Sequence, residues 1–137
     1  MYRLLILLLA LCPLSVPAQE RTPAPGNAEL YFISPADGAT VSNPVIVRFG
    51  LKNMGVAPAG IKYDNSGHHH LLVDTELPAL GFPIINDENH LHYGGGQTEA
   101  TLELPPGEHT LQLLLGDFAH IPHEPAVVSE RITITVE

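Results

Sequence analysis

The stretch that decides the fold is Thr98-Glu99-Ala100-Thr101-Leu102-Glu103-Leu104, in which Ala100, Leu102 and Leu104 alternate with polar residues. Side chains two positions apart point to the same side of an extended strand, so this alternation gives the strand one apolar face. Pro105-Pro106-Gly107 then reverses the chain, and residues 109–115 run back with leucines at alternate positions. The pattern predicts a strand, a turn and a second strand.

The same period recurs on both sides of this stretch. Residues 45–51 alternate through Val45, Val47, Phe49 and Leu51, and residues 132–136 alternate in the same way at the end of the chain. Gly and Pro residues separate the strand-like segments, and no segment keeps a helical period for three turns. We therefore expect an all-β fold, an immunoglobulin-like antiparallel β-sandwich in a single domain. A small closed barrel is the alternative.

The first residues have the pattern of a secretory signal. Met1-Tyr2-Arg3 is a short positive lead, residues 4–11 are continuously apolar, and Val16-Pro17-Ala18 suits cleavage after Ala18. The apolar run is too short to span a membrane, which needs about 20 residues. We expect residues 1–18 to be a signal peptide, residues 19–28 a flexible leader and residues 29–137 the domain. The protein would then be periplasmic or secreted, with no membrane insertion after cleavage.

Composition removes several classes of function. Cys12 is the only cysteine and leaves with the signal, so disulfides, thiolate metal sites and a cysteine nucleophile are excluded. Arg3 leaves as well, and five basic residues against fifteen acidic ones give a formal charge of −10. Such a surface repels phosphate backbones, so nucleic acid is excluded as a partner and a cation is favoured.

The histidines are clustered in the sequence. Seven of the eight fall into three groups, which we call the first, second and third histidine knots: His68-His69-His70, His90-Leu91-His92 and His120-Ile121-Pro122-His123. Imidazole is the commonest protein ligand for metals and also changes charge near neutral pH. The knots therefore indicate either a metal site or a polar network.

Spacing selects the candidate ligands. In a strand, two histidines two positions apart project one way, so each of the first two knots offers a pair, and the third offers its two histidines from a turn. The six candidate ligands are His68, His70, His90, His92, His120 and His123. Asp74 and Asp117 follow the first knot and precede the third, where each could hold a ligand imidazole in one tautomer. His69 would point to the opposite face, and His109 alone favours a structural role.

Three functions are compatible with these residues. The first is a periplasmic, non-enzymatic binding protein that holds a divalent transition metal, Cu(II) or Zn(II), as imidazole ligation without thiolates suggests. The second is an interaction module for an envelope protein, with histidines forming a structural loop network. The third, a metal-dependent oxidoreductase, would require an open coordination position. We expect at least two of the knots to meet at one end of the sandwich.

The chain also resembles an uncharacterised bacterial exported family. Three stretches carry the resemblance: Gly67-His68-His69-His70-Leu71-Leu72-Val73-Asp74, residues 88–99 (ENHLHYGGGQTE) and residues 115–125 (LGDFAHIPHEP). The family is classed as a domain of unknown function. The resemblance therefore implies export and supplies no activity or ligand.

Overall fold

The computed structural model describes residues 19–137, so the expected signal peptide lies outside the described residues. Every regular element in this part of the chain is a strand. In chain order they are β1 (Glu29–Ser34), β2 (Thr40–Val41), β3 (Val45–Lys52), β4 (Gly55–Val56), β5 (Ser66–Val73), β6 (His90–Tyr93), β7 (Glu99–Leu102), β8 (Gly107–Gly116) and β9 (Ile132–Val136). In residues 19–137 there is no helix with the length and apolarity to cross a membrane.

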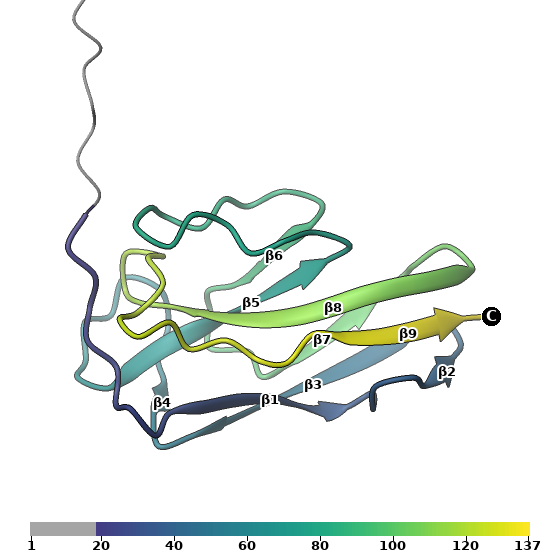
Figure 1. Cartoon of the computed structure of the whole chain (residues 1–137), viewed down its shortest axis with the longest axis horizontal. Coiled ribbons are helices and arrows are strands. Elements are labelled where there is room, and N and C mark those ends of the chain that lie inside the picture. Colours follow the sequence, from purple (N-terminus) through teal and green to yellow (C-terminus); the bar gives the residue numbers. More distant parts are fainter. Residues whose placement is uncertain (1–18) are drawn as a thin grey trace, which may run out of the picture.

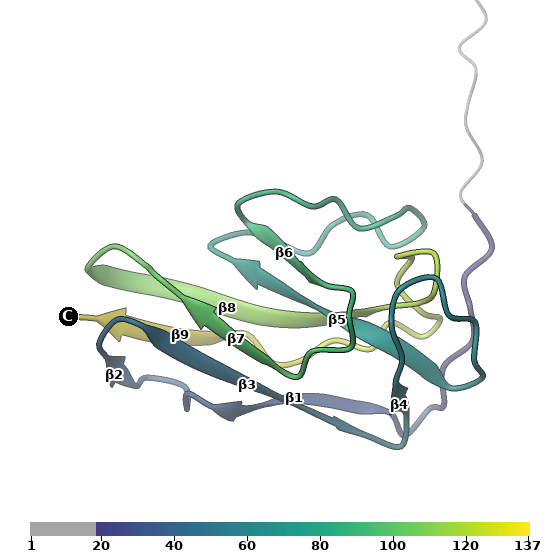
Figure 2. The same cartoon turned by 180° about the vertical axis from the view of Figure 1, so that it is seen from behind.

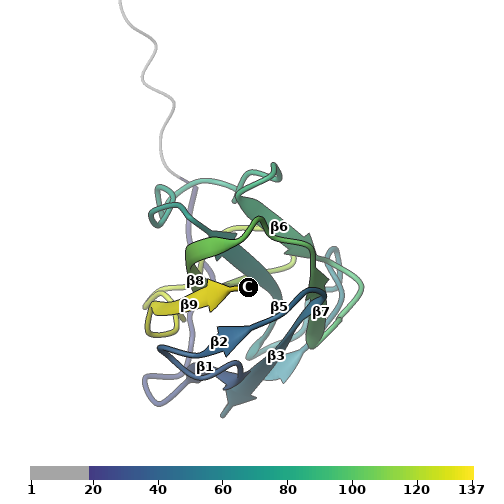
Figure 3. The same ribbon diagram turned by 90° about the vertical axis from the view of Figure 1, so that its right-hand side faces the viewer.

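The strands form two sheets packed face to face (Figures 1 and 3). The smaller sheet has the order β1-β3-β7, and the larger has the order β2-β9-β8-β5-β4, with β6 also paired to β5. Most pairs are antiparallel, but β2 runs parallel to β9 and β4 runs parallel to β5. The expected all-β sandwich is confirmed.

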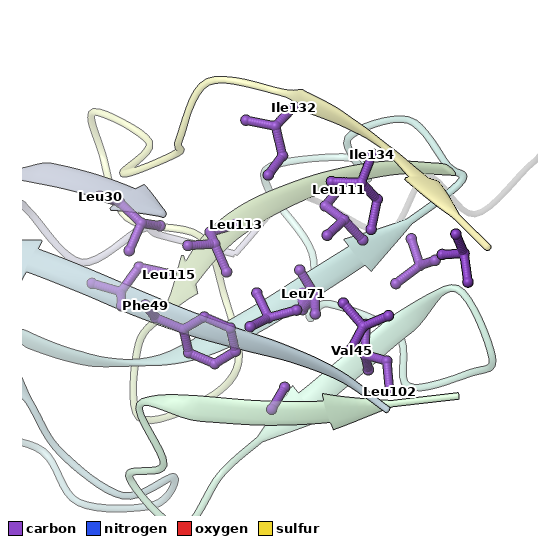
Figure 4. Packing of buried hydrophobic residues seen from close by; sticks show 14 of the residues in the cluster. Leu30, Val45, Phe49, Leu71, Leu102, Leu111, Leu113, Leu115, Ile132 and Ile134 are labelled. Atoms are coloured by element: carbon purple, nitrogen blue, oxygen red, sulfur yellow. The ribbon is translucent and has the colours of Figure 1, made fainter. Parts of the chain in front are cut away.

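The alternating residues that predicted the strands make the core between the sheets. Ala100 and Leu102 on β7 are buried, and so are the three alternate leucines of β8 and the alternate apolar residues of β9. Figure 4 shows side chains of the larger sheet packed against those of the smaller sheet: Leu111, Leu113, Leu115, Ile132 and Ile134 against Leu30, Val45, Phe49 and Leu102. The turn at 105–107 also crosses between the sheets, because β7 pairs with β3 whereas β8 pairs with β5 and β9.

The larger sheet is also covered on its outer face. Leu72 and Leu114 lie outside the main core and yet are almost fully buried, together with Ile84 and Ile121 from the loops. This explains why Leu114 interrupts the alternation of β8, since it faces a second apolar layer rather than solvent. All eight residues of β5 are buried as a result.

Residues 21–24, within the stretch expected to be a flexible leader, form hydrogen bonds with the third knot and its neighbour Glu124. Thr22 and Ala24 exchange backbone hydrogen bonds with Glu124 at 2.9 Å, and the Arg21 Nε donates to the carbonyl of Pro122 at 2.9 Å. The polar and Pro-rich composition predicted flexibility because it has no apolar period. Backbone pairing requires no such period, and it fixes residues 21–24 against the third knot.

Candidate metal site

Strand β5 separates the three histidines of the first knot. His69 lies on the core face, where its ring centroid is 5.1 Å from that of Phe49. His68 and His70 therefore point to the outer face, next to Leu72. Both are fully or almost fully buried, at 0% and 1% exposure. The first knot thus contributes two imidazoles to the layer beneath the loops.

Strand β6 brings the second knot to the same face. Its pairing with β5 sets His92 opposite His70, and their rings stack with centroids 5.1 Å apart. The His92 centroid is also 5.0 Å from that of His68. Figure 2 shows β6 alongside β5, at the edge of the larger sheet.

The third knot completes the group from the loop after β8. The ring centroid of His120 lies 5.0 Å from that of His68, 4.8 Å from that of His92 and 6.2 Å from that of His70. We call His68, His70, His92 and His120 the four-histidine cluster. A ligand nitrogen from each of His68, His70 and His92 lies within 4.8 Å of the others. The expected convergence is observed, on the outer face of the larger sheet.

Two glycines leave room for these imidazoles. A Cβ added at Gly116 would lie 2.7 Å from His70 Cε1, and one at Gly94 would lie 2.3 Å from His92 Cε1. Real Cβ atoms essentially never approach so closely, so no other residue fits beside these rings in their present positions. Gly94 is the first of three consecutive glycines that follow the second knot, and the absence of a side chain lets the backbone approach the His92 ring.

Asp117 shapes the loop that carries His120. Its Oδ1 accepts hydrogen bonds from the backbone N–H groups of Ala119 and Ile121, and its Oδ2 accepts one from the Thr22 hydroxyl at 2.6 Å. His120 itself has a φ of 67°, a left-handed conformation that is uncommon outside glycine. Asp117 thus acts on His120 through the backbone, whereas the sequence suggested that it could hold an imidazole directly.

The cluster holds neutral imidazoles with free nitrogens. Among the described residues, neither ring nitrogen of His68 or His70 has a hydrogen-bond partner, and neither has Nε2 of His92. Burial, and then the neighbouring imidazoles, lower the pKa of His70 from 6.5 to about 2 and that of His68 to about 4. Burial and His120 also lower the pKa of His92. At neutral pH these rings carry a lone pair, which is the form that binds a metal.

The remaining candidate ligands lie elsewhere. In the pairing of β6 with β5, His90 lies opposite Leu72 rather than opposite a histidine. Its Nδ1 lies 2.8 Å from Asp87 Oδ1. His123 is buried, and its Nε2 donates to the Ser66 carbonyl at 3.1 Å. The structure therefore gathers four of the six candidates.

Asp74 contacts His109 and not a residue of the first knot. Its Oδ2 lies 2.7 Å from His109 Nδ1, and its Oδ1 accepts from the backbone N–H of Thr110 at 2.8 Å. His109 Nε2 lies 2.8 Å from the Pro105 carbonyl. Both imidazole nitrogens thus face oxygen acceptors, and the Asp74 carboxylate raises the pKa of His109. This arrangement fits the structural role expected for His109.

The chain belongs to a known sequence family. The matching family is described as Domain of unknown function (DUF4399), and the match covers residues 47–137. The family resemblance inferred from the histidine motifs is confirmed, because all three knots lie within the match. Comparisons with curated proteins and with solved structures gave no match. The family description gives no activity, so function has to be argued from the site.

Proposed function

We propose that this protein is an exported binding protein that holds one divalent transition metal ion, Zn(II) or Cu(II), in the four-histidine cluster. The observation that carries the proposal is the convergence of four imidazoles from three separate segments, and three of these imidazoles have buried ring nitrogens with no partner among residues 19–137. The histidine-only donor set suits these borderline ions, whereas Mg(II) and Ca(II) prefer oxygen ligands.

The distances support binding after a small adjustment. Ligand atoms at 2.0–2.1 Å from one ion are separated by at most about 4.2 Å. The nitrogens of His68, His70 and His92 already lie within 4.8 Å of each other, so small side-chain rotations suffice. All three lie on paired strands, which makes the base of the site rigid.

The second candidate, a structural histidine network in an interaction module, is less well supported. Such a network would gain stability if the imidazoles hydrogen-bonded to each other or to the loops. His68 and His70 make no such bond within residues 19–137, and each unsatisfied buried group costs about 1–3 kcal/mol. A bound ion would satisfy one nitrogen of each of these rings.

Export is part of the proposal and rests on the N-terminal sequence. The positive lead, apolar run and small residue at Ala18 are typical of a cleaved signal. A periplasmic or secreted location would also expose the protein to ions that cytoplasmic chelators do not control. Fractionation of cells that produce the full chain, followed by N-terminal sequencing, would test the expected start at Gln19.

Titration of the purified, chelator-treated protein tests metal binding. At pH 7.5 we expect uptake of about one equivalent of Zn(II) or Cu(II), with heat release in calorimetry and a higher melting temperature, since a ligand that binds only the folded state stabilises it. An absence of both heat and stabilisation with either ion would refute the proposal and favour the interaction module.

Two histidines of β6 provide a matched pair of variants. His92 lies in the cluster, whereas His90, two residues earlier on the same strand, contacts Asp87. We expect His92→Gln to weaken metal binding strongly and His90→Gln to leave it nearly unchanged. Equal loss of binding in both variants would contradict the assigned ligands.

A further inference from the structure

The arrangement of the four imidazoles bears on the geometry of coordination, which the proposed function leaves open. From the spacing of the rings we infer that the four-histidine cluster is a tetrahedral site built for Zn(II) rather than a tetragonal site for Cu(II). The inference rests on the proposed function. It goes further because it specifies the number of ligands, the geometry and the preferred ion.

The six ring-to-ring distances match a tetrahedron in size. An imidazole bound through nitrogen at 2.0–2.1 Å has its ring centre about 3.2 Å from the metal, so four tetrahedral rings have centres about 5.2 Å apart. Five of the observed centroid distances lie between 4.7 and 5.1 Å, and the sixth, from His70 to His120, is 6.2 Å. The ring centres therefore have the spacing of a four-coordinate site, and the ligand nitrogens of three of its rings, His68, His70 and His92, lie within 4.8 Å of one another.

The same ring-to-ring distances do not fit a square-planar arrangement of the four imidazoles. Square-planar ligands, which Cu(II) favours, form four short sides and two diagonals that are both about 1.4 times longer. Only the His70–His120 distance is long, at 6.2 Å. The opposite pair, His68 and His92, is 5.0 Å apart, which is as short as the sides.

The protein resists rearrangement to a square. His68 and His70 lie on one strand, and His92 is fixed to the next by strand pairing. Gly116 and Gly94 lie directly against the rings of His70 and His92. Flattening the cluster would require these three rings to move together, whereas a tetrahedron requires small rotations of the three rings and the approach of His120 to His70.

The loop position of His120 makes that approach feasible. His120 comes from the irregular segment between β8 and β9, and its carbonyl accepts a hydrogen bond from the Ile84 backbone at 2.8 Å. It is partly exposed, whereas His68 and His70 are buried. We assign it as the fourth ligand, which closes the site over the three strand-borne imidazoles.

Affinity alone cannot test the geometry, because Cu(II) binds nitrogen sites more tightly than Zn(II) in general. Cobalt(II) is the appropriate probe, since its visible absorption is intense in tetrahedral sites and weak in six-coordinate ones. We expect the Co(II)-loaded protein to show the intense bands, and one equivalent of Zn(II) to abolish them. The Cu(II)-loaded protein should give an electron paramagnetic resonance spectrum distorted from the tetragonal form.

Two variants identify the fourth ligand. His120→Gly removes the imidazole and tolerates the left-handed backbone, so we expect a changed Co(II) spectrum and at least a 10-fold loss of Zn(II) affinity. His90→Gln should retain the intense bands. Weak Co(II) bands together with a tetragonal Cu(II) spectrum would overturn the tetrahedral assignment while leaving metal binding intact. Failure to take up Co(II), Zn(II) or Cu(II) would refute the proposed function itself.

Discussion

At the scale of single residues, the glycines beside the cluster matter as much as the histidines. Gly116→Ala would place a methyl group 2.7 Å from His70 Cε1, so the ring must move. We expect metal affinity to fall about 10-fold or more, because disturbing the groups that position a metal ligand typically has that effect. Gly55→Ala is the control, since its Cβ would meet no atom closer than 3.9 Å. Unchanged affinity in Gly116→Ala would show that His70 is not a ligand.

His109 makes a separate contribution to stability that depends on pH. Its pKa is raised by Asp74 in the folded protein, so the folded state holds the proton more tightly than the unfolded state does. This stabilisation is complete below the unfolded pKa of 6.5 and is lost as pH rises through the folded pKa. We expect His109→Gln to cost up to about 1 kcal/mol at pH 6 and less at pH 9, measured by urea unfolding. An equal cost at both pH values would contradict this role.

At the scale of elements, residues 21–24 stabilise the loop that carries His120. The Thr22 hydroxyl donates to the same Asp117 carboxylate that accepts from Ala119 and Ile121. A hydrogen bond to a charged group is worth about 1.5–3 kcal/mol. We expect Thr22→Val to weaken Zn(II) binding several-fold by loosening His120, with little change in the secondary structure seen by circular dichroism.

The exposed Thr101 on β7 supplies the control for that experiment. Thr101→Val changes the same side chain on a strand of the smaller sheet, which contributes no histidine to the cluster. We expect Thr101→Val to bind Zn(II) as the unaltered protein does. If Thr22→Val also binds with unchanged affinity, residues 21–24 do not position His120.

Strand alternation and histidine spacing explain why part of the architecture could be predicted. The alternation in residues 98–104 and 132–136 correctly predicted which side chains face the core. The two-residue spacing of His68 and His70 correctly placed both on one face of their strand. The sequence could not show which of His90 and His92 joins the four-histidine cluster, because both side chains lie on the same face of β6. It depends on the register with β5, which sets His92 beside His70 and His90 beside Leu72. No local pattern encodes that register.

At the scale of the whole molecule, the loops convert an exposed sheet face into a second interior. Residues 74–89 and 117–130 form no regular strand, and they bury Ile84 and Ile121 over β5 and β8. No sequence pattern predicted this layer, since a few apolar residues in a loop are not periodic. Burial by these loops is also what lowers the pKa of His68 and His70.

That burial predicts how the stability of the metal-free protein depends on pH. His68 and His70 have folded pKa values of about 4 and about 2, whereas both would titrate near 6.5 in the unfolded chain. Between pH 6.5 and about 4 the unfolded state therefore binds more protons than the folded state, and acidification favours unfolding. Each histidine contributes at most about 1.4 kcal/mol per pH unit in this window.

We expect the metal-free protein to lose several kcal/mol of unfolding free energy between pH 6.5 and pH 4.5, measured by urea denaturation at a series of pH values. His70→Leu should flatten this slope by up to about 1.4 kcal/mol per pH unit, because it removes one of the imidazoles that the unfolded state protonates in this pH window. His109→Gln is the control, since the raised pKa of His109 lies above this pH window and the variant should leave the slope nearly unchanged. A His70→Leu slope equal to that of the unaltered protein would mean that His70 is not buried as a neutral imidazole, and the free lone pair on which the proposed metal site depends would lose its support.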